Sequence, residues 1–343
     1  MVHIKNMHFC ENIGKMLNPK NILLSRTDAI GDVCLTLPIC MALKEKFPTA
    51  KLTFLCTKYT RAVVDCFSSI DAILTLEEIQ ALGQNDRMAL LGNFDVVVHV
   101  FPNKQVAAWC KKAKIAMRIG TSHRWFHWFY CNQRPRFSRI HSPIHEAQLN
   151  FKLLIPLGIL ETPSLEKINA NLSFLPSQLQ LDHQMSDWQN VILMHPKSNG
   201  SGVEYDMGNY IKLAKQLSSK GYLIFFTGTE KEGSNFREQI PNDPRIFDFT
   251  GKWDLPSFIA VISKVKALVA CSTGPYHIAG LSGIRAIGLF SQRNPVHSGR
   301  WAALGPKVVA LTARKSCKAC ASGKNCQCIQ EIELKDIIHA IES

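Results

Sequence analysis

The sequence lacks a long apolar run. It contains no stretch of about 18 uninterrupted apolar residues, the length that a membrane-spanning helix needs. The longest candidate, residues 265–290, is interrupted by Lys266, His277, Arg285 and several glycines. Residues 1–11 hold no apolar run of signal-peptide length. We therefore expect neither a membrane span nor secretion, and we predict a cytoplasmic protein.

Three familiar signatures are also missing. The chain has no G-x-G-x-x-G fingerprint and no Walker loop, which argues against a nicotinamide dehydrogenase and a P-loop kinase. It has no G-x-S-x-G elbow, so its histidines give no sequence support for a Ser-His-Asp triad. These absences do not exclude other nucleotide-dependent enzymes or binding proteins.

Acidic residues are scarce, and residues 96–145 contain none. The whole chain carries 40 Lys+Arg against 27 Asp+Glu, a formal charge of +13, which indicates an anionic partner. The aromatic run Trp125–Tyr130 lies among basic residues, a combination that suits an anionic membrane surface or a phosphorylated glycolipid. There are two alternatives. One is that the aromatic side chains stack on nucleic acid bases. The other is that they pack in the core while the charged side chains are solvated. The basic residues of this segment are Lys104, Lys111, Lys112, Lys114, Arg118, Arg124, Arg134, Arg136 and Arg139.

The composition is that of an ordinary globular protein. With 343 residues and 46% hydrophobic side chains, the chain is long enough for two domains. Most of its 12 cysteines are scattered through apparent strands and helices, where free thiols act as small hydrophobes in a reducing compartment.

Short Val/Ile/Leu runs alternate with amphipathic helical patterns in two blocks, which predicts two doubly wound, Rossmann-like α/β domains with ligands at the carboxyl ends of the strands. Strands are expected at residues 21–24, 52–55, 72–74, 96–98, 191–194, 222–226, 267–270 and 286–290, and helices around 210–217, 258–265 and 334–341. The polar stretch 169–187 marks the boundary. The expected segments are an extension 1–18, an N-terminal Rossmann-like domain 19–175, a C-terminal Rossmann-like domain 176–328 and a terminal helix 329–343.

The first candidate site follows the first strand, where Gly31 allows a tight turn and Asp32 begins a helix. A carboxylate there can act as a general base. On spacing alone the sequence favours the other role, a cap for the helix, since Asp is among the best N-caps.

Two further loops follow strands of the second block. In residues 271–277, Thr273 is a plausible N-cap and Pro275 suits the first helical turn, so the backbone N–H groups form a potential phosphate site. Residues 195–202 form a loop of small residues after another strand.

Four cysteines follow each other closely as C-x2-C-x5-C-x-C: Cys317, Cys320, Cys326 and Cys328. Four thiolates can hold zinc, but the usual structural pattern has two C-x-x-C pairs separated by a longer loop. The spacing therefore favours free thiols, with a metal site as the alternative.

Taken in order, these segments resemble the lipopolysaccharide heptosyltransferase family of bacterial glycosyltransferases (glycosyltransferase family 9). The similarity runs from about residue 20 to 335, each motif being weak alone and the ordered set strong. The matching segments are 22–33 with Leu37-Pro38, 251–255, 271–279, 288–290 and Asn294-Pro295, with milder echoes at His145, His195-Pro196 and Thr227-Gly228.

The resemblance implies the GT-B fold, in which two Rossmann-like domains face a cleft that binds a nucleotide sugar, usually ADP-heptose. It implies that residues 19–175 are the acceptor-binding domain and residues 176–328 the nucleotide-sugar-binding domain. It implies that Asp32 is the general base of an inverting transfer that needs no metal or cofactor. The donor-binding residues that we assign are His195, Lys197, Ser198, Thr227, Gly228, Glu232, Leu255, Ser272, Thr273, Gly274, Pro275 and His277. Arg118 and Arg124 are our candidates for an anionic, lipid-linked saccharide acceptor, because a guanidinium fork suits phosphate and carboxylate.

The sequence departs from the family at two positions. Ser272 stands where the family usually has Asp, and the loop Gly202–Tyr205 lacks the family's Lys or Arg before an aromatic residue. Two alternatives therefore accompany heptosyl transfer: the same fold with another nucleotide-sugar donor, or a non-catalytic protein that binds nucleotide or glycolipid. No nucleic acid partner is expected.

Overall fold

The computed structural model describes residues 18–139, 142–176, 187–198, 200, 202–324 and 326–343. The chain divides into two compact units, Met1–Ser173 and Phe174–Ser343, called here the N-terminal and C-terminal units. The expected extension 1–18 lies outside the described residues except for its last position, and so does much of the expected linker. The last helix, expected as a separate segment, packs within the C-terminal unit.

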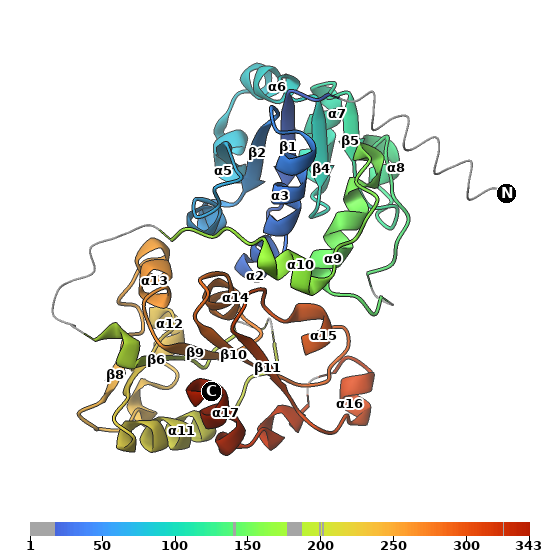
Figure 1. Ribbon diagram of the computed structural model, residues 1–343. Helices are drawn as coiled ribbons and strands as arrows, with labels where there is room; N and C mark the ends of the chain where they lie inside the picture. Colours follow the sequence, from blue (N-terminus) through green and yellow to red (C-terminus); the bar gives the residue numbers. More distant parts are fainter. Residues whose placement is uncertain (1–17, 140–141, 177–186, 199, 201, 325) are drawn as a thin grey trace. The chain divides into compact units, whose positions relative to one another are not determined.

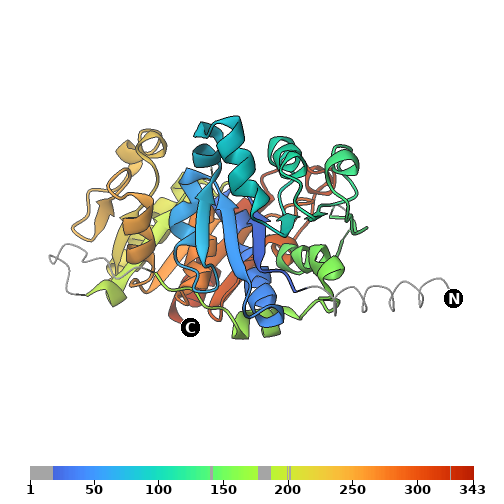
Figure 2. The same cartoon turned by 90° about the horizontal axis from the view of Figure 1, so that it is seen from above.

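The N-terminal unit is a five-stranded parallel sheet with helices on both faces (Figures 1 and 2). The strand order is β3 (Ala72–Thr75), β2 (Lys51–Cys56), β1 (Asn21–Ser25), β4 (Val96–His99) and β5 (Met117–Ile119). Its α-helices are α2 (Ile30–Cys34), α3 (Leu37–Lys46), α4 (Arg61–Val64), α5 (Leu76–Ala81), α6 (Gln84–Gly92), α7 (Lys104–Lys112), α8 (His127–Tyr130), α9 (Glu146–Phe151) and α10 (Leu165–Ala170).

The C-terminal unit is a six-stranded parallel sheet of the same kind. The strand order is β11 (Val308–Thr312), β10 (Arg285–Phe290), β9 (Ala267–Cys271), β6 (Val191–His195), β7 (Leu223–Phe226) and β8 (Ile246–Asp248). Its α-helices are α11 (Met207–Ser219), α12 (Glu230–Gly233), α13 (Leu255–Ile262), α14 (Gly274–Leu281), α15 (Ser298–Trp301), α16 (Lys318–Ala321) and α17 (Leu334–Glu342). In Figure 1, α11 and α17 lie on one face of this sheet and α13 and α14 on the other.

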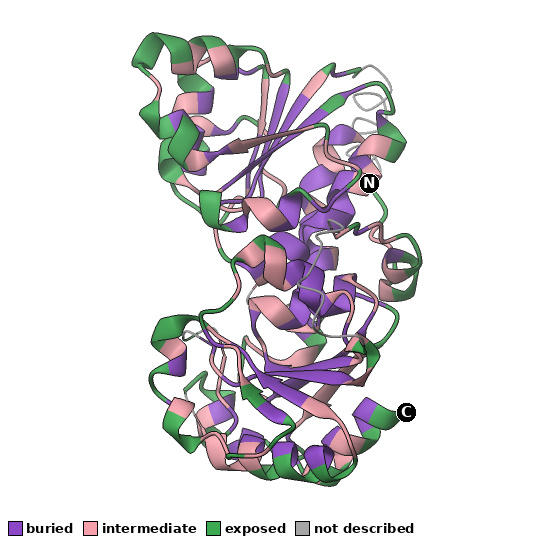
Figure 3. Cartoon of the chain, turned by 90° about the vertical axis from the view of Figure 1, so that its left-hand side faces the viewer, coloured by how far each residue is buried: buried purple, intermediate pink, exposed green. Residues whose placement is uncertain are grey.

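The central strands are apolar because both of their faces are covered. Leu23, Leu55 and Val97 pack against residues of α5, α6 and α7, and the alternate residues of the same strands are also buried. Figure 3 shows both sheets as buried strands between helices whose outer surfaces are exposed. Near-continuous Val/Ile/Leu runs are the sequence consequence of such two-sided burial.

All eight expected strands are present, and three were missed. The missed strands β5, β8 and β11 lie at sheet edges, where one side has no neighbouring strand, and their residues are mostly half-buried or exposed. β5 and β8 each have three residues, one of them charged, and so lack the apolar run that marks a central strand. β11 does contain such a run, Val308–Leu311, and was missed in spite of it. The periodic pattern also predicted a helix that continues to Val265, but α13 ends at Ile262.

Each sheet has one point where the order of connection reverses. β1 lies between β2 and β4, and β6 lies between β7 and β9. The register places Ser25 beside His99 and His195 beside Ala270, so the loops that leave these strands start side by side. Ligands of doubly wound sheets bind at such reversals, at the carboxyl ends of the strands.

Within the described part of the chain, no helix is both long and apolar enough to cross a bilayer. The eleven cysteines of that part are all free.

Candidate active site

Asp32 lies in the first turn of α2, just after the carboxyl end of β1. The N-cap of α2 is Ala29, and no side chain caps this helix end. The capping interpretation of Asp32 is therefore wrong. The carboxylate instead accepts from Arg26, and the side chain keeps 23% of its surface exposed.

Arg26 holds this carboxylate in place. Its Nη2 donates to Oδ1 of Asp32, and its Nε donates to Oδ1 of Asp28 over 2.7 Å. Arg26 is only 4% exposed, so the ion pair forms largely away from water. Such a buried cation both orients a carboxylate and offsets part of its desolvation cost.

The surroundings raise the pKa of Asp32 above the ordinary aspartate value. Burial is the largest cause, the charge of Glu146 adds to it, and Arg26 and Arg139 oppose it. Burial likewise raises the pKa of Asp28 to about 6. A carboxylate with a raised pKa is a stronger base, which suits proton abstraction near neutral pH.

A second buried ion pair in this unit was not predicted from the sequence. Glu146, 2% exposed at the start of α9, accepts from Nη1 of Arg139, whose Nη2 donates to Asn150 Oδ1 over 3.0 Å. Asn150 Nδ2 donates in turn to the carbonyl of Leu35 over 3.0 Å, between α2 and α3. The sequence offered one signal for this ion pair. Glu146 is the first acidic residue after the acid-free segment, and it lies directly before an apolar helix.

The acid-free segment presents an aromatic surface. Trp125, Trp128 and Phe129 are 65%, 53% and 64% exposed, so the interpretation of these three rings as core is wrong, whereas Phe126 and His127 are buried. We call Trp125, Trp128 and Phe129 the aromatic patch. Basic side chains cover two of its rings: Lys104 Nζ lies 4.9 Å from the centre of Trp125, and the Arg134 guanidinium 4.6 Å from that of Trp128.

The two acceptor candidates differ in environment. Arg118 is committed to the protein, because its Nε donates to the carbonyl of Tyr130 over 2.8 Å and its Nη1 donates to that of Ile115. Arg124 is exposed in the turn before α8. Of the two, the position of Arg124 is better suited to an external anion.

In the C-terminal unit, His195 ends β6 and faces the strand beside it. Its Nδ1 lies 3.1 Å from Oγ1 of Thr227, which follows β7. Burial lowers the pKa of His195 to about 4, so the ring is neutral near pH 7. Its ring also stacks on Phe258, which stacks on Trp253. These flat, half-buried aromatics were not singled out from the sequence.

Lys197 and Ser198 are both engaged by Glu204. Lys197 Nζ donates to Glu204 Oε2 over 3.0 Å, and the Ser198 N–H donates to Oε1 over 2.9 Å. Although burial opposes it, these hydrogen bonds keep the pKa of Glu204 below its ordinary value. The loop in which the family's cation is missing thus carries an anion paired with Lys197. Asn199 and Ser201 of this loop lie outside the described residues.

The loop after β9 leads into α14 as expected. Thr273 is the N-cap and Pro275 lies in the first turn, but the Thr273 side chain does not cap the helix. Its Oγ1 is buried and has no hydrogen-bond partner among the described residues, which is costly unless another group supplies one. Gly202 passes close to Ser272, since a Cβ on Gly202 would lie 3.4 Å from the Ser272 carbonyl oxygen. The 195–202 and 271–277 loops are therefore neighbours. Gly274, Pro275 and His277 belong to the second loop and also form the start of α14.

Glu232 has a structural role of its own. It forms a reciprocal capping box with Thr229 at the start of α12, accepting from the Thr229 N–H over 2.7 Å. Gly228 lies against it, because a Cβ there would meet Glu232 Oε2 at 3.3 Å. Leu255 is the first residue of α13, which Asp254 caps through the Ser257 N–H.

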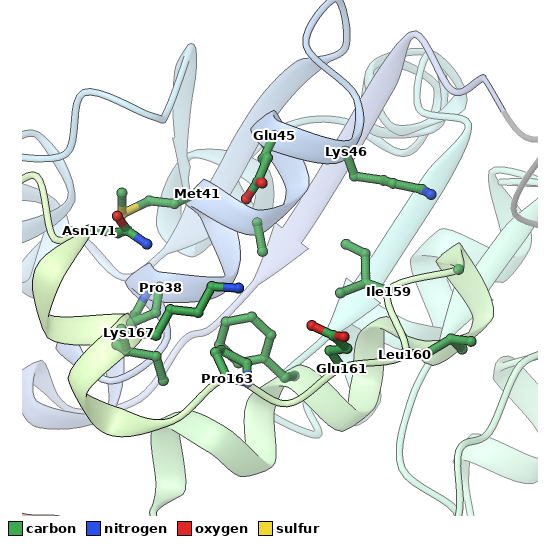
Figure 4. Close-up of a pocket in the computed structure, with 14 residues that line it drawn as sticks. Pro38, Met41, Glu45, Lys46, Ile159, Leu160, Glu161, Pro163, Lys167 and Asn171 are labelled. Carbon is green, nitrogen blue, oxygen red and sulfur yellow. The ribbon is translucent and has the colours of Figure 1, made fainter.

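A pocket of about 940 Å³ lies in the N-terminal unit, between α3 and residues 158–171 (Figure 4). Charges of both signs surround it, with Glu45 and Lys46 on one side and Glu161 and Lys167 on the other. None of the residues that line this pocket is among the site residues that we assigned from the sequence.

Comparison with known proteins gives consistent matches. The model of glycosyltransferase family 9 (heptosyltransferase) matches residues 87–329. The lipopolysaccharide core heptosyltransferase OpsX of Haemophilus influenzae is 24% identical over 295 residues, which are 82% of this chain and 81% of that protein. The structure of a glycosyl transferase family 9 protein from Veillonella parvula superimposes with a TM-score of 0.73 at 19% identity, covering 94% of this chain and 96% of that one. That of Escherichia coli ADP-heptose lps heptosyltransferase II gives 0.69 at 16% identity, covering 94% and 97%.

Proposed function

The chain belongs to glycosyltransferase family 9, the heptosyltransferase family, and from this premise we propose that it transfers heptose from ADP-heptose to the inner core of lipopolysaccharide. That it is a glycosyltransferase of the GT-B fold follows from the family and the fold. The names of two similar proteins support the finer assignment, one being a lipopolysaccharide core heptosyltransferase and the other an ADP-heptose enzyme.

The observation that carries the proposal is the Asp32 carboxylate, buried against Arg26 at the reversal point of the N-terminal sheet. Asp32 takes the proton from an acceptor hydroxyl as that oxygen attacks the anomeric carbon of the sugar. The bond between the anomeric carbon and the diphosphate breaks on the opposite side, so the configuration inverts and ADP leaves with the electron pair. Arg26 keeps the base oriented and does not itself carry a proton away.

The diphosphate leaves with negative charge, and the loops after β6 and β9 offer groups that stabilise it. The free N–H groups at the start of α14 and the unpartnered Thr273 hydroxyl suit a phosphate oxygen. Lys197 adds a cation, reduced in effect by Glu204. The half-buried rings of Trp253 and Phe258 suit a nucleobase. We propose that the transfer step itself uses neither metal nor cofactor.

The aromatic patch supports a lipid-linked acceptor. Exposed Trp and Phe among basic residues favour the interface of an anionic membrane. We therefore propose that the protein works in the cytoplasm, in peripheral contact with the inner face of the inner membrane, with Arg124 near the acceptor.

The test is a transfer assay with purified protein, ADP-heptose and lipopolysaccharide truncated before its first heptose. We expect ADP release and a mass gain of one heptose on the acceptor. Asp32→Asn should lower kcat by about 10²–10⁴-fold, the usual contribution of a general base. Asp86→Asn, which changes an exposed carboxylate of the same unit, is the matched control.

UDP-, GDP- and CDP-sugars are tested in parallel. Transfer from one of these and none from ADP-heptose would overturn the donor while leaving the enzyme class intact. Binding of ADP without transfer to any acceptor, and unchanged behaviour of Asp32→Asn, would favour the non-catalytic alternative.

A further inference from the structure

The four clustered cysteines come together in the C-terminal unit. Cys317 precedes α16, Cys320 lies in it, and Cys326 and Cys328 lead into the short helix that follows. Their four Sγ atoms all lie within 4.8 Å of one another. Cys320 and Cys328 are buried, and Cys317 and Cys326 are half-buried.

Ordinary packing does not account for this gathering. Among the described residues, the cluster contains Ala313 as its one buried residue besides the cysteines. The chain leaves the sheet after β11 and forms a single turn of helix, Lys318–Ala321, and no large apolar side chain of the described residues belongs to this cluster. Small lobes with so little core are typically stabilised by a disulfide or a structural metal.

The geometry suits a tetrahedral metal ion. With metal–sulfur distances of about 2.3 Å, a tetrathiolate zinc site has sulfurs about 3.8 Å apart. The four Sγ atoms here lie within 4.8 Å of one another, and the pair Cys320–Cys326, at 2.9 Å, would have to separate by about 1 Å to hold the ion. The Cys320 N–H donates to Cys317 Sγ over 3.4 Å, which helps to fix the position of that sulfur within the cluster. Lys315, Lys318 and Lys324 flank the site and offset the net negative charge of four thiolates around a divalent ion.

We propose that Cys317, Cys320, Cys326 and Cys328 bind one Zn²⁺ ion as a structural site. Four sulfur ligands select zinc or iron over magnesium and calcium, and a closed set of four protein ligands leaves no open position for substrate. The ion is therefore separate from the transfer chemistry. The spacing alone favoured free thiols, and the convergence of the sulfurs is what reverses that expectation.

Hydrogen bonds join the cysteine cluster and the segment after it to other loops of the same unit. The Asn294 N–H, in the loop after β10, donates to the Cys320 carbonyl over 3.1 Å. Directly after the cysteines, Gln330 Oε1 accepts from the Asp206 N–H over 2.8 Å, and Gln330 Nε2 donates to the Glu204 carbonyl over 3.0 Å. The ion would thus stabilise the segment that holds Glu204, the partner of Lys197.

The experiment measures metal in the full-length protein, purified under reducing conditions without added metal or chelator. Inductively coupled plasma mass spectrometry should find zinc at one ion per chain. Cys317→Ser and Cys326→Ser should each reduce the zinc to background, and Cys40→Ala, which removes a buried thiol of the N-terminal unit, should leave it unchanged. Replacement of zinc by Co²⁺ in the unaltered protein should produce the visible bands of tetrahedral cobalt thiolate, a readout that does not depend on the variants folding.

Three results would overturn the proposal. One is a metal-free chain with four thiols that react freely with a thiol reagent. Another is a disulfide between Cys320 and Cys326, whose Sγ atoms lie 2.9 Å apart, detected by mass spectrometry of protein kept anaerobic. The third is a full complement of iron, lost in the same variants, which would refute the assignment of zinc.

Discussion

The Arg26 guanidinium, almost fully buried at the end of β1, donates from Nη2 to Oδ1 of Asp32. The same guanidinium donates from Nε to Asp28 over 2.7 Å, so one cation serves two carboxylates. The charge of Asp32 helps to raise the pKa of Asp28, and Arg26 lowers the pKa of both carboxyl groups. This arrangement makes the pH behaviour of the site a property of the cluster.

The buried charge of Glu146 should set part of the basicity of Asp32. Glu146→Gln removes a negative charge that raises the pKa of Asp32, so that pKa should fall. A base works only when deprotonated, so the acid limb of the kcat/KM profile should move to lower pH. Glu166→Gln, an exposed residue of the same unit, is the control and should leave the limb in place. An unchanged limb in Glu146→Gln would contradict the proposed role of Asp32.

Asp28 should make folding stability depend on pH. Its folded pKa of about 6 lies above the unfolded value of about 3.9, so the folded state holds the proton more tightly. The resulting stability is present below pH 3.9 and is lost as pH rises through 6, by about 3 kcal/mol in full. Urea unfolding from pH 4 to 7 should show this loss as a difference between the unaltered protein and Asp28→Asn. If the free energy of unfolding changed with pH in the same way in both proteins, this role of Asp28 would be refuted.

Glu204 should weaken nucleotide binding by pairing with Lys197. Glu204→Gln removes the charge but keeps an amide oxygen for the Ser198 N–H, so Lys197 becomes available to the diphosphate. We expect ADP to bind about threefold more tightly, the size typical of a half-exposed ion pair. Isothermal titration calorimetry at two salt concentrations measures this, and the gain should shrink at higher salt. Glu238→Gln controls for net charge, and an equal gain there would exclude a local effect.

The aromatic patch should drive membrane association. Replacing Trp125, Trp128 and Phe129 by Ala should reduce binding to anionic vesicles about tenfold or more, because the exposed rings contribute most of the apolar area. The melting temperature should hardly change, since these side chains are exposed. Co-sedimentation with vesicles of phosphatidylglycerol and phosphatidylethanolamine is the measurement. Tyr59→Ala removes another exposed ring, 67% accessible, and should bind like the unaltered protein.

The fold class and most of its strands could be predicted from local patterns. A strand such as 96–98 is buried on both faces, so its apolar run is visible in the sequence. The edge strands β5 and β8 escaped prediction because each has only three residues and one of them is charged. The ordered motifs from residue 22 to 295 also indicated the family, which the match to residues 87–329 confirms.

What each candidate residue does in the site depended on partners distant in the chain. Asp32 was visible as a carboxylate after a strand, but the buried charge of Glu146, more than a hundred residues later, comes from the packing of α9. Similarly, the cysteine spacing by itself favoured free thiols, and only the folded loop brings the four sulfurs within 4.8 Å of one another.

The sequence by itself therefore determined the alternation of strands and helices and the residue types at the ends of the strands, because both follow from local burial and turn chemistry. The tertiary structure decided which charges face each other, which rings remain exposed and which thiols converge. Coulomb interactions, desolvation and metal coordination depend on distance in space, and separation along the chain does not specify that distance.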